Sequence, residues 1–257
     1  MQVIAIPCSF DNYAYLLICT ETRKAVVVDP AEYYPVSTTI DKEKVELEGI
    51  FCTHHHADHI GGLEDLLGEF PGVSVSGFGG DSARIPAMDS MLRDGAEVSV
   101  GKIRGKVLHT PGHTSGSLCF RFEEHLFTGD TLFGAGCGRI FEGSYEEMNH
   151  CLNNRIAKMA PETRIYFGHE YTLQNLKFAA FVDPDNKAVS DRFIRIKALR
   201  DKGGQSCPST LAEELATNPF LRCEQPSLLA QVGGRITAES REPLEVFTAL
   251  RRLKDGF

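Results

Sequence analysis

The sequence predicts an α/β region over residues 1–172, followed by a helical region over residues 173–257. Two short runs rich in β-branched and aromatic residues, Ala14–Ile18 and Ala25–Val28, predict buried strands. A third run, Gly49–Thr53, leads into a histidine-rich loop and then into Leu63–Phe70, whose apolar residues have helical spacing. Beyond residue 172 the strand pattern fades, and helices are predicted over 173–182, 186–202, 210–216 and 243–254.

One further helix is predicted inside the α/β region, over Tyr145–Met159. Its apolar residues recur at helical spacing. Ser144 and Glu147 have the spacing of a capping box, in which each side chain binds the backbone of the other residue at the start of the helix. The helix is therefore expected to begin directly after Ser144.

The composition is that of a folded chain without a membrane span. Of 257 residues, 42% are hydrophobic and 24% are charged, and no apolar run approaches the roughly 18 residues that a span requires. The first residues lack the basic and apolar regions of a signal peptide. The eight cysteines form no C-x-x-C pair, so reduced thiols are expected. We expect a monomeric cytoplasmic protein with no membrane partner.

Charge is distributed unevenly along the chain. The formal net charge is −8, which argues against a general nucleic-acid-binding protein. Residues 1–172 carry 14 basic and 24 acidic residues, whereas residues 173–257 carry 13 and 11. The acidic residues are thus concentrated in the α/β region, and the helical region is mildly basic.

Four predicted strands each end by delivering histidine or aspartate. The first leads into His54-His55-His56-Ala57-Asp58-His59, and the later ones lead to His113, Asp130 and His169. Loops at the ends of strands on a rigid scaffold are where binding residues are usually found. The order of these residues on four strand ends therefore predicts a metal site.

The number of candidate ligands indicates two ions. In an extended loop, side chains two residues apart project to the same side, so His54 and His56 can converge on one ion while His55 points away. A tetrahedral zinc site has four positions, and a catalytic site keeps one of them open. Two ions that share a bridging carboxylate and a bridging water accommodate all seven candidates, which are His54, His56, Asp58, His59, His113, Asp130 and His169.

Several motifs resemble known families. The segments THHHADHIGG, TPGHTSGS, FTGDTLF and FGHEY resemble the metallo-β-lactamase superfamily, which implies a four-layer αβ/βα sandwich. The segments DNYAYLL, GCGRIFEG, GHEYTLQNLKFA, NPFLR and LRRLKD resemble the glyoxalase II (hydroxyacylglutathione hydrolase) family over nearly the whole chain. The resemblance implies a catalytic domain over residues 1–172 and a smaller, all-helical substrate-binding domain over residues 173–257.

The resemblance also implies how the ligands divide between two divalent metal ions, with zinc, iron and manganese as the candidates. The mixed histidine and carboxylate ligands do not select among these metals. The implied first-ion ligands are His54, His56 and His113. Those of the second ion are Asp58, His59 and His169, with Asp130 bridging both ions.

The activity that the resemblance implies is hydrolysis of S-2-hydroxyacylglutathione thioesters, with S-D-lactoylglutathione giving D-lactate and glutathione in methylglyoxal detoxification. A water that bridges two cations roughly 3.5–4 Å apart has a lowered pKa and becomes a hydroxide nucleophile near neutral pH. Asp58 is expected to orient this nucleophile as well as to bind metal. A serine route is not expected, because the sequence has no G-x-S-x-G motif.

The substrate side of the site is likewise implied by the resemblance. Glutathione carries two carboxylates, and the family motifs place its binding groups at Arg139, Tyr171, Arg251 and Lys254. Without the resemblance, Arg251 and Lys254 would be interpreted as the solvated end of a helix. Phe141 departs from the family pattern, which often has tyrosine there, so one hydrogen bond to glutathione is expected to be absent.

Other classes of protein fit these residues less well. A persulfide dioxygenase of the same superfamily would use one iron and would lack much of the helical tail. A metallo-nuclease is disfavoured by the net charge of −8. A true β-lactamase is disfavoured because Asp130 stands where several such enzymes have cysteine. A metal-stabilised scaffold would have a closed metal site, whereas the surplus of ligands here indicates an open one.

Overall fold

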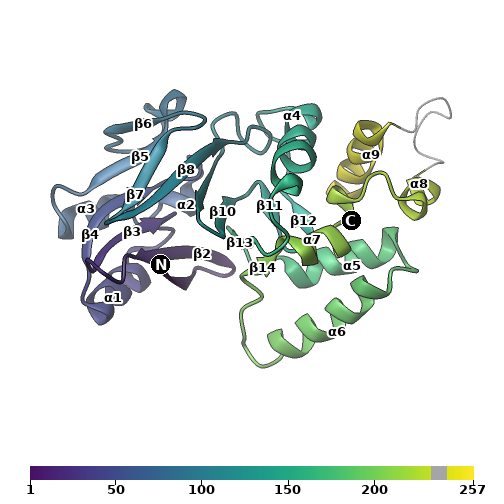
Figure 1. Cartoon of the computed structure of the whole chain (residues 1–257), viewed down its shortest axis with the longest axis horizontal. Helices are drawn as coiled ribbons and strands as arrows, with labels where there is room; N and C mark the ends of the chain where they lie inside the picture. Colours follow the sequence, from purple (N-terminus) through teal and green to yellow (C-terminus); the bar gives the residue numbers. More distant parts are fainter. Residues whose placement is uncertain (233–241) are drawn as a thin grey trace. The chain divides into compact units, whose positions relative to one another are not determined.

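The computed structural model describes residues 1–232 and 242–257, and its elements group into two compact units (Figure 1). Unit 1 contains Met1–Thr110, Gly116–Asp130 and Phe167–His169. Unit 2 contains Pro111–Ser115, Thr131–Tyr166 and Glu170–Phe257. The units alternate along the chain, and the domain boundary expected at residue 172 stays a prediction. Within the described ranges, no helix has the length and apolar character needed to cross a membrane.

The first sheet of unit 1 combines antiparallel and parallel pairing. Its strands lie in the order β1 (Gln2–Cys8), β2 (Asn12–Ile18), β3 (Lys24–Val28), β4 (Glu46–Phe51), β5 (Ser74–Phe78) and β6 (Ser90–Leu92). Pairing is antiparallel from β1 to β3 and parallel from β3 to β6. Parallel neighbours need a crossover connection. Helix α1 (Tyr33–Glu43) lies in the connection between β3 and β4, and α3 (Leu63–Glu69) lies in that between β4 and β5.

Both faces of this sheet are covered within unit 1. On one face, Val36 of α1 and Leu66 of α3 belong to the same buried cluster as Leu16 of β2. The other face packs against antiparallel strands of the second sheet, β7 (Glu97–Val100), β8 (Ile103–His109), β9 (Leu118–Phe122) and β10 (His125–Gly129). Aromatic rings fill this interface, and the ring centroids of Phe51 and Phe120 lie 5.0 Å apart. The apolar runs that predicted buried strands are therefore buried on both faces.

The predicted helix over Tyr145–Met159 is present in unit 2 but is not uniform. It begins as α4 (Tyr145–Asn149), continues as a π-helical segment, η2 (His150–Arg155), and ends in a 3₁₀ turn, η3 (Ile156–Lys158). The capping box between Ser144 and Glu147 is confirmed. The apolar spacing predicted which side chains are buried, but it carries no information on the hydrogen-bond register that distinguishes these helix types.

The rest of unit 2 is mostly helical, as predicted. A short hairpin pairs β11 (Leu132–Phe133) with β12 (Gly136–Cys137), and β13 (Arg164–Phe167) pairs with β14 (Ser209–Thr210) at Arg164 and Ile165. The helices are α5 (Thr172–Val182), α6 (Lys187–Arg200), α7 (Leu211–Thr217), η4 (Pro219–Leu221), α8 (Pro226–Val232) and α9 (Pro243–Asp255). Their core includes Phe178, Phe220 and Phe247. The ring of Phe220 packs against that of Phe178 and against that of Phe247.

Candidate metal centre and substrate-binding residues

The histidine-rich loop begins where β4 ends. The Thr53 backbone N–H and hydroxyl donate to the two carboxylate oxygens of Asp29, at 2.7 and 2.6 Å, which holds the start of the loop. Nε2 of His54 lies 3.1 Å from Nδ1 of His56, so the side chains two residues apart converge. Helix α2 (Ala57–Ile60) follows directly after His56.

The side chain of His55 makes different contacts from those of His54 and His56. Its Nδ1 atom lies 3.5 Å from Oδ2 of Asp81, and its Nε2 atom lies 3.2 Å from Nη1 of Arg84. Arg84 in turn pairs with Asp81. This contact agrees with the prediction that His55 supports the loop while its neighbours converge.

A second group of side chains gathers around Asp130 inside unit 1. Asp130 follows directly after β10, and His169 follows β13 at the next residue but one. Nε2 of His59 lies 3.3 Å from Oδ1 of Asp130 and 3.2 Å from Nε2 of His169. Nε2 of His169 lies 3.5 Å from Oδ2 of Asp130 and 3.3 Å from Oδ2 of Asp58. The two carboxylate oxygens of Asp130 thus face two different imidazoles, and all but the half-exposed Asp58 are buried.

Two glycines explain why this convergence is possible. A Cβ atom on Gly168 would collide with Oδ1 of Asp130 and would lie 2.7 Å from Cε1 of His59. A Cβ atom on Gly129 would collide with the Thr53 hydroxyl, and Gly129 also has a φ of 47°, in the left-handed region. The Gly-Asp and Gly-His pairs of the motifs therefore let strand ends approach each other closely.

The imidazoles are oriented by partners on their other ring nitrogen. Nδ1 of His59 lies 3.0 Å from Oδ2 of Asp29, and Nδ1 of His169 lies 2.9 Å from Oδ1 of Asp11. Such partners fix the tautomer and leave Nε2 available to a metal. Asn12 adds a further contact, because its amide donates to the Asp58 backbone oxygen at 2.9 Å.

Sequence reasoning missed these orienting residues. Asp29 could have been found, since it follows the apolar strand ending at Val28 in the same way that the candidate ligands follow theirs. Asp11 and Asn12 begin the DNYAYLL segment that carries the family resemblance, but they lie at and just after a turn between two strands, and turn chemistry alone gave them no role in the site.

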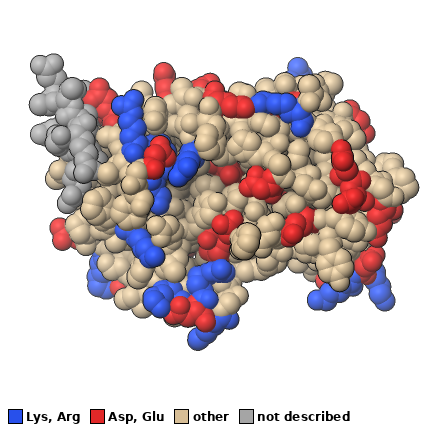
Figure 2. All heavy atoms as spheres, turned by 180° about the vertical axis from the view of Figure 1, so that it is seen from behind, with Lys and Arg blue, Asp and Glu red and all other residues tan. Residues whose placement is uncertain are grey.

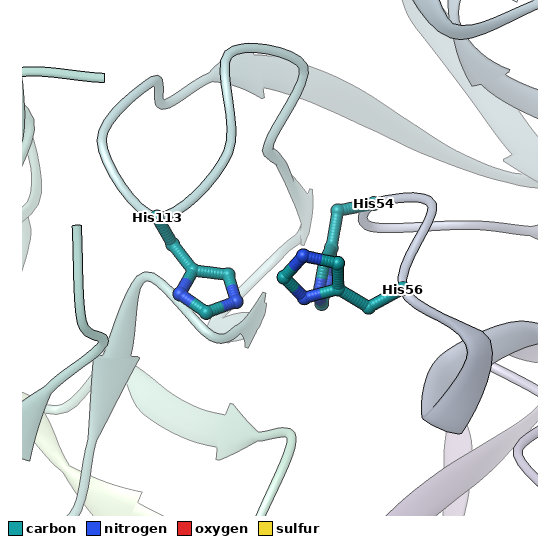
Figure 3. Close-up of side chains that lie close together, drawn as sticks. All are labelled: His54, His56 and His113. Carbon is teal, nitrogen blue, oxygen red and sulfur yellow. The ribbon is translucent and has the colours of Figure 1, made fainter. Parts of the chain in front are cut away.

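His113 belongs to a loop of unit 2. Its Nδ1 atom lies 2.7 Å from the backbone oxygen of Arg139, and its ring packs edge-on against Phe141 at 5.3 Å. Figure 3 draws the side chain of His113, from this loop, and those of His54 and His56, from the histidine-rich loop.

The carboxylates of the cluster stabilise positive charge at its centre. Burial disfavours the charged form of His59, but the carboxylates of Asp130 and Asp29 outweigh burial and hold the pKa of His59 well above its usual value. In the same way, burial opposes protonation of His169, yet Asp130 and Asp58 raise its pKa to about 10. Conversely, hydrogen bonding to His169 holds the pKa of Asp58 below its usual range.

These residues fit divalent metal ions. Imidazole nitrogens and carboxylate oxygens converge, and the positive charge that the carboxylates stabilise on the imidazoles is the charge that a cation would supply. The groups Asp58–His59–His169 and Asp29–His54–His59 also bring their ligand atoms within 4.8 Å of one another. Since Asp29 already binds Thr53 and the Nδ1 side of His59, the first of these groups is the better candidate.

The predicted substrate-binding residues all lie in unit 2, and they differ in exposure. Phe141 is 62% exposed and Tyr171 is 37% exposed. The exposed guanidinium of Arg139 lies 3.8 Å from Asp255. Burial, together with nearby Arg251, lowers the pKa of the Lys254 amine to about 8.

Arg251 is buried, with 2% of its surface exposed. Its Nη1 atom donates to the Cys137 backbone oxygen at 2.8 Å, and its Nη2 atom donates to Asp255 at 3.0 Å. The guanidinium also lies over the ring of Phe220, 5.1 Å from its centroid. These contacts favour a structural role for Arg251, and its predicted contact with substrate stays a prediction.

Comparisons with known proteins agree with the motifs over the whole chain. A family model described as the metallo-beta-lactamase superfamily matches residues 10–169, and one described as the hydroxyacylglutathione hydrolase C-terminus matches residues 170–257. The fold is thus a metallo-β-lactamase fold with mixed sheets and helices, followed by a helical C-terminal domain.

Two curated relatives and one solved structure illustrate the similarity. The hydroxyacylglutathione hydrolase of Synechococcus sp. (strain JA-3-3Ab) is 44% identical and covers 100% of both chains. That of Methylococcus capsulatus is 43% identical over 100% of this chain and 99% of its own. The crystal structure of ETHE1 from Myxococcus xanthus is 26% identical with a TM-score of 0.68, over 98% of this chain and 91% of that one. Because the full-length relatives exceed 40% identity and both family models match, the chain belongs to the hydroxyacylglutathione hydrolase family of the metallo-β-lactamase superfamily.

Proposed function

We propose that the protein hydrolyses S-2-hydroxyacylglutathione thioesters, converting S-D-lactoylglutathione to D-lactate and glutathione in methylglyoxal detoxification. The observation that carries this proposal is the buried cluster in which His59 and His169 face the two oxygens of Asp130 beside Asp58. This cluster lies in a chain whose full-length relatives are named hydroxyacylglutathione hydrolases, which makes the enzyme a thioester hydrolase.

Two divalent cations would be held by the residues that the motifs predicted. Zinc is our first choice of metal. Iron and manganese also stay candidates, because the mixed ligands suit all three metals. When bound, such cations lower the pKa of a shared water and stabilise negative charge on a carbonyl oxygen. The first ion would take His54, His56 and His113, the second Asp58, His59 and His169, and Asp130 would serve both.

The protein's own groups prepare these ligands. Asp29 and Asp11 accept from the Nδ1 atoms of His59 and His169, so each imidazole presents an unprotonated Nε2 atom when a cation replaces the proton. Asp58 is ionised at neutral pH, since its pKa lies below the usual range. Its half-exposed carboxylate is therefore an acceptor that can orient an attacking water.

The chemistry of the substrate reduces what the protein must supply. Water oxygen bonds to the thioester carbonyl carbon, the carbon–sulfur bond breaks, and glutathione leaves as its thiolate. A thiolate is a better leaving group than an alkoxide or an amine. A strong general acid is therefore not needed at the sulfur.

Glutathione would be held by residues of unit 2. Arg139 and Lys254 supply positive charge for its carboxylates, and Tyr171 supplies a hydroxyl. Phe141 supplies an exposed ring but no hydroxyl. Arg251 would mainly hold the segment that precedes Arg139 in place, since it donates to the Cys137 backbone oxygen.

The decisive experiment is a hydrolysis assay on S-D-lactoylglutathione with metal content measured on the same sample. We expect two metal ions per chain and release of glutathione that disappears after treatment with EDTA and returns with added metal. Full activity in metal-free protein would refute the mechanism. Oxygen uptake with glutathione persulfide, at one iron per chain, would favour the dioxygenase instead; the family model that matches residues 170–257 supports the hydrolase.

The expectation that the protein has no nucleic-acid partner stays a prediction of the sequence. Figure 2 shows that, on the face drawn, the lysine and arginine side chains of the described residues stand in small groups among acidic ones, without a continuous basic stripe. Such a stripe would be typical of a nucleic-acid-binding surface. The monomeric state and the cytoplasmic location stay predictions of the sequence.

A further inference from the structure

We propose that Glu214, on helix α7, is a positioning residue for substrate binding, which acts by holding the β11–β12 hairpin that leads to Arg139. The hairpin is Leu132–Cys137, and Arg139 follows it by two residues. The inference deepens the proposed function and rests on the proposed role of Arg139 and Phe141 in holding glutathione.

The Glu214 carboxylate is completely buried and has three donors. Oε2 accepts from the Ala135 backbone N–H at 2.7 Å and from the Asn218 amide at 3.1 Å. Oε1 accepts from Nη2 of Arg192, on α6, at 2.6 Å. The carboxylate therefore joins two helices of the C-terminal region to the tip of the hairpin, beside which α5 and α7 lie (Figure 1).

Successive peptide groups of the hairpin are held in this way. Asn175 of α5 donates to the Gly134 oxygen at 3.1 Å, and Asn218 donates to the Gly136 oxygen at 3.0 Å. Between them, Ala135 has a φ of 56°, in the left-handed region that residues other than glycine seldom adopt. Such a conformation persists only when the surroundings determine it, and the Glu214 bond to the Ala135 N–H provides that determination.

A buried ion pair by itself adds little to the stability of a protein. Replacing such a pair by apolar residues of similar volume is often neutral or stabilising, whereas removing one partner is costly. A carboxylate, however, can accept from a backbone N–H, an amide and a guanidinium at the same time, and such charge-assisted bonds are short and directional. The arrangement of Glu214, Arg192 and Asn218 therefore indicates that these contacts fix the position of the hairpin.

The held segment continues to the substrate-binding residues. At the end of the hairpin, the Cys137 oxygen accepts from Arg251 at 2.8 Å, and two residues later the Arg139 oxygen lies 2.7 Å from Nδ1 of His113. The Phe141 N–H donates to the His113 backbone oxygen at 3.1 Å. A shift of the hairpin tip would therefore reach Arg139 and Phe141, which are proposed to bind glutathione, before it reached His113 through its bonds to them.

The test compares Glu214→Gln with Arg192→Met/Glu214→Leu. In Glu214→Gln the charge and one acceptor are lost, and we expect KM for S-D-lactoylglutathione to rise about tenfold while kcat changes less than about threefold. The double variant removes the buried charge pair but leaves the Ala135 N–H and the Asn218 amide without their acceptor. We therefore expect it to stay folded with a lower Tm and to keep the raised KM. Metal content should be unchanged in both variants.

Two matched measurements distinguish positioning from a structural role. Asp191→Asn alters an exposed carboxylate on α6 that pairs with Lys187 at the surface, and it should leave KM unchanged. Hydrogen exchange at the Ala135 N–H should be faster in the double variant than in the wild type. This measurement is made without substrate. Wild-type KM in a folded double variant, or unchanged exchange at Ala135, would overturn the inference. Absence of turnover by the wild-type protein would instead refute the proposed function.

Discussion

The Nδ1 atom of His59 lies 3.0 Å from Oδ2 of Asp29, at the end of a neighbouring strand, while its Nε2 atom faces Asp130. The imidazole is therefore held between two carboxylates, one that orients it and one that shares its proposed metal. The same Asp29 carboxylate accepts from Thr53 at the start of the histidine-rich loop. One buried side chain thus sets both the path of the loop and the tautomer of a candidate ligand.

We expect Asp29→Asn to weaken the second metal site. The amide lacks the negative charge that supports His59, and loss of such a partner typically lowers metal affinity about 10- to 100-fold. Metal content after dialysis against a weak chelator would measure the effect. Asp94→Asn, whose carboxylate accepts from the His109 N–H outside the cluster, is the matched control and should keep both metals. Equal metal retention by the two variants would contradict the role assigned to Asp29.

His55→Ala and His59→Ala should behave oppositely, although the residues are four apart in the same motif. His55 contacts Asp81 and Arg84, so its loss should leave about two metals per chain. His59 lies in the Asp130 cluster, so its loss should remove most of the second metal. Elemental analysis of both purified variants decides the matter, and a His55→Ala variant that lost metal as readily as His59→Ala would refute the assignment.

Binding of the substrate should weaken as pH rises through about 8. Burial, with Arg251 nearby, lowers the pKa of Lys254 to about 8, so the amine is charged below this pH and neutral above it. Because the substrate is anionic, KM should rise as the charge is lost. Lys254→Arg keeps its charge over this range and should remove the rise. Surface residue Lys187, replaced by methionine, serves as the control and should leave the KM–pH profile as in the wild type.

Phe141→Tyr should strengthen binding of the substrate. The ring is exposed, so a hydroxyl can be added without burying a polar group. A net gain of about 0.5–1.5 kcal/mol for one hydrogen bond corresponds to a KM lower by roughly two- to tenfold, with kcat unchanged. Phe181→Tyr adds the same hydroxyl to an exposed ring on α5 and controls for general effects. If both variants keep the wild-type KM, Phe141 does not face glutathione.

The strand and helix pattern could be predicted well because burial dictates it. Apolar runs such as Ala25–Val28 became buried strands, and each C-terminal segment with helical spacing became a helix. One exception is the π-helical segment after α4, since the spacing of apolar residues does not specify a hydrogen-bond register. Another is α8 (Pro226–Val232), where no helix was predicted. Ser144 and Glu147 were predictable as a capping box because that contact is local in sequence.

Local sequence was enough to identify which side chains could serve as ligands and on which strand ends they lie. Histidine and aspartate chemistry, adjacent glycines and strand-end positions are all local properties, and they were sufficient to nominate residues such as His59 and Asp130. Three contacts could be seen only in the folded chain: Asp29 binds the Nδ1 atom of His59, Arg251 is buried against Cys137, and Glu214 accepts from the Ala135 N–H. These contacts join residues far apart in the chain, and no periodicity or motif spacing encodes the distance between them.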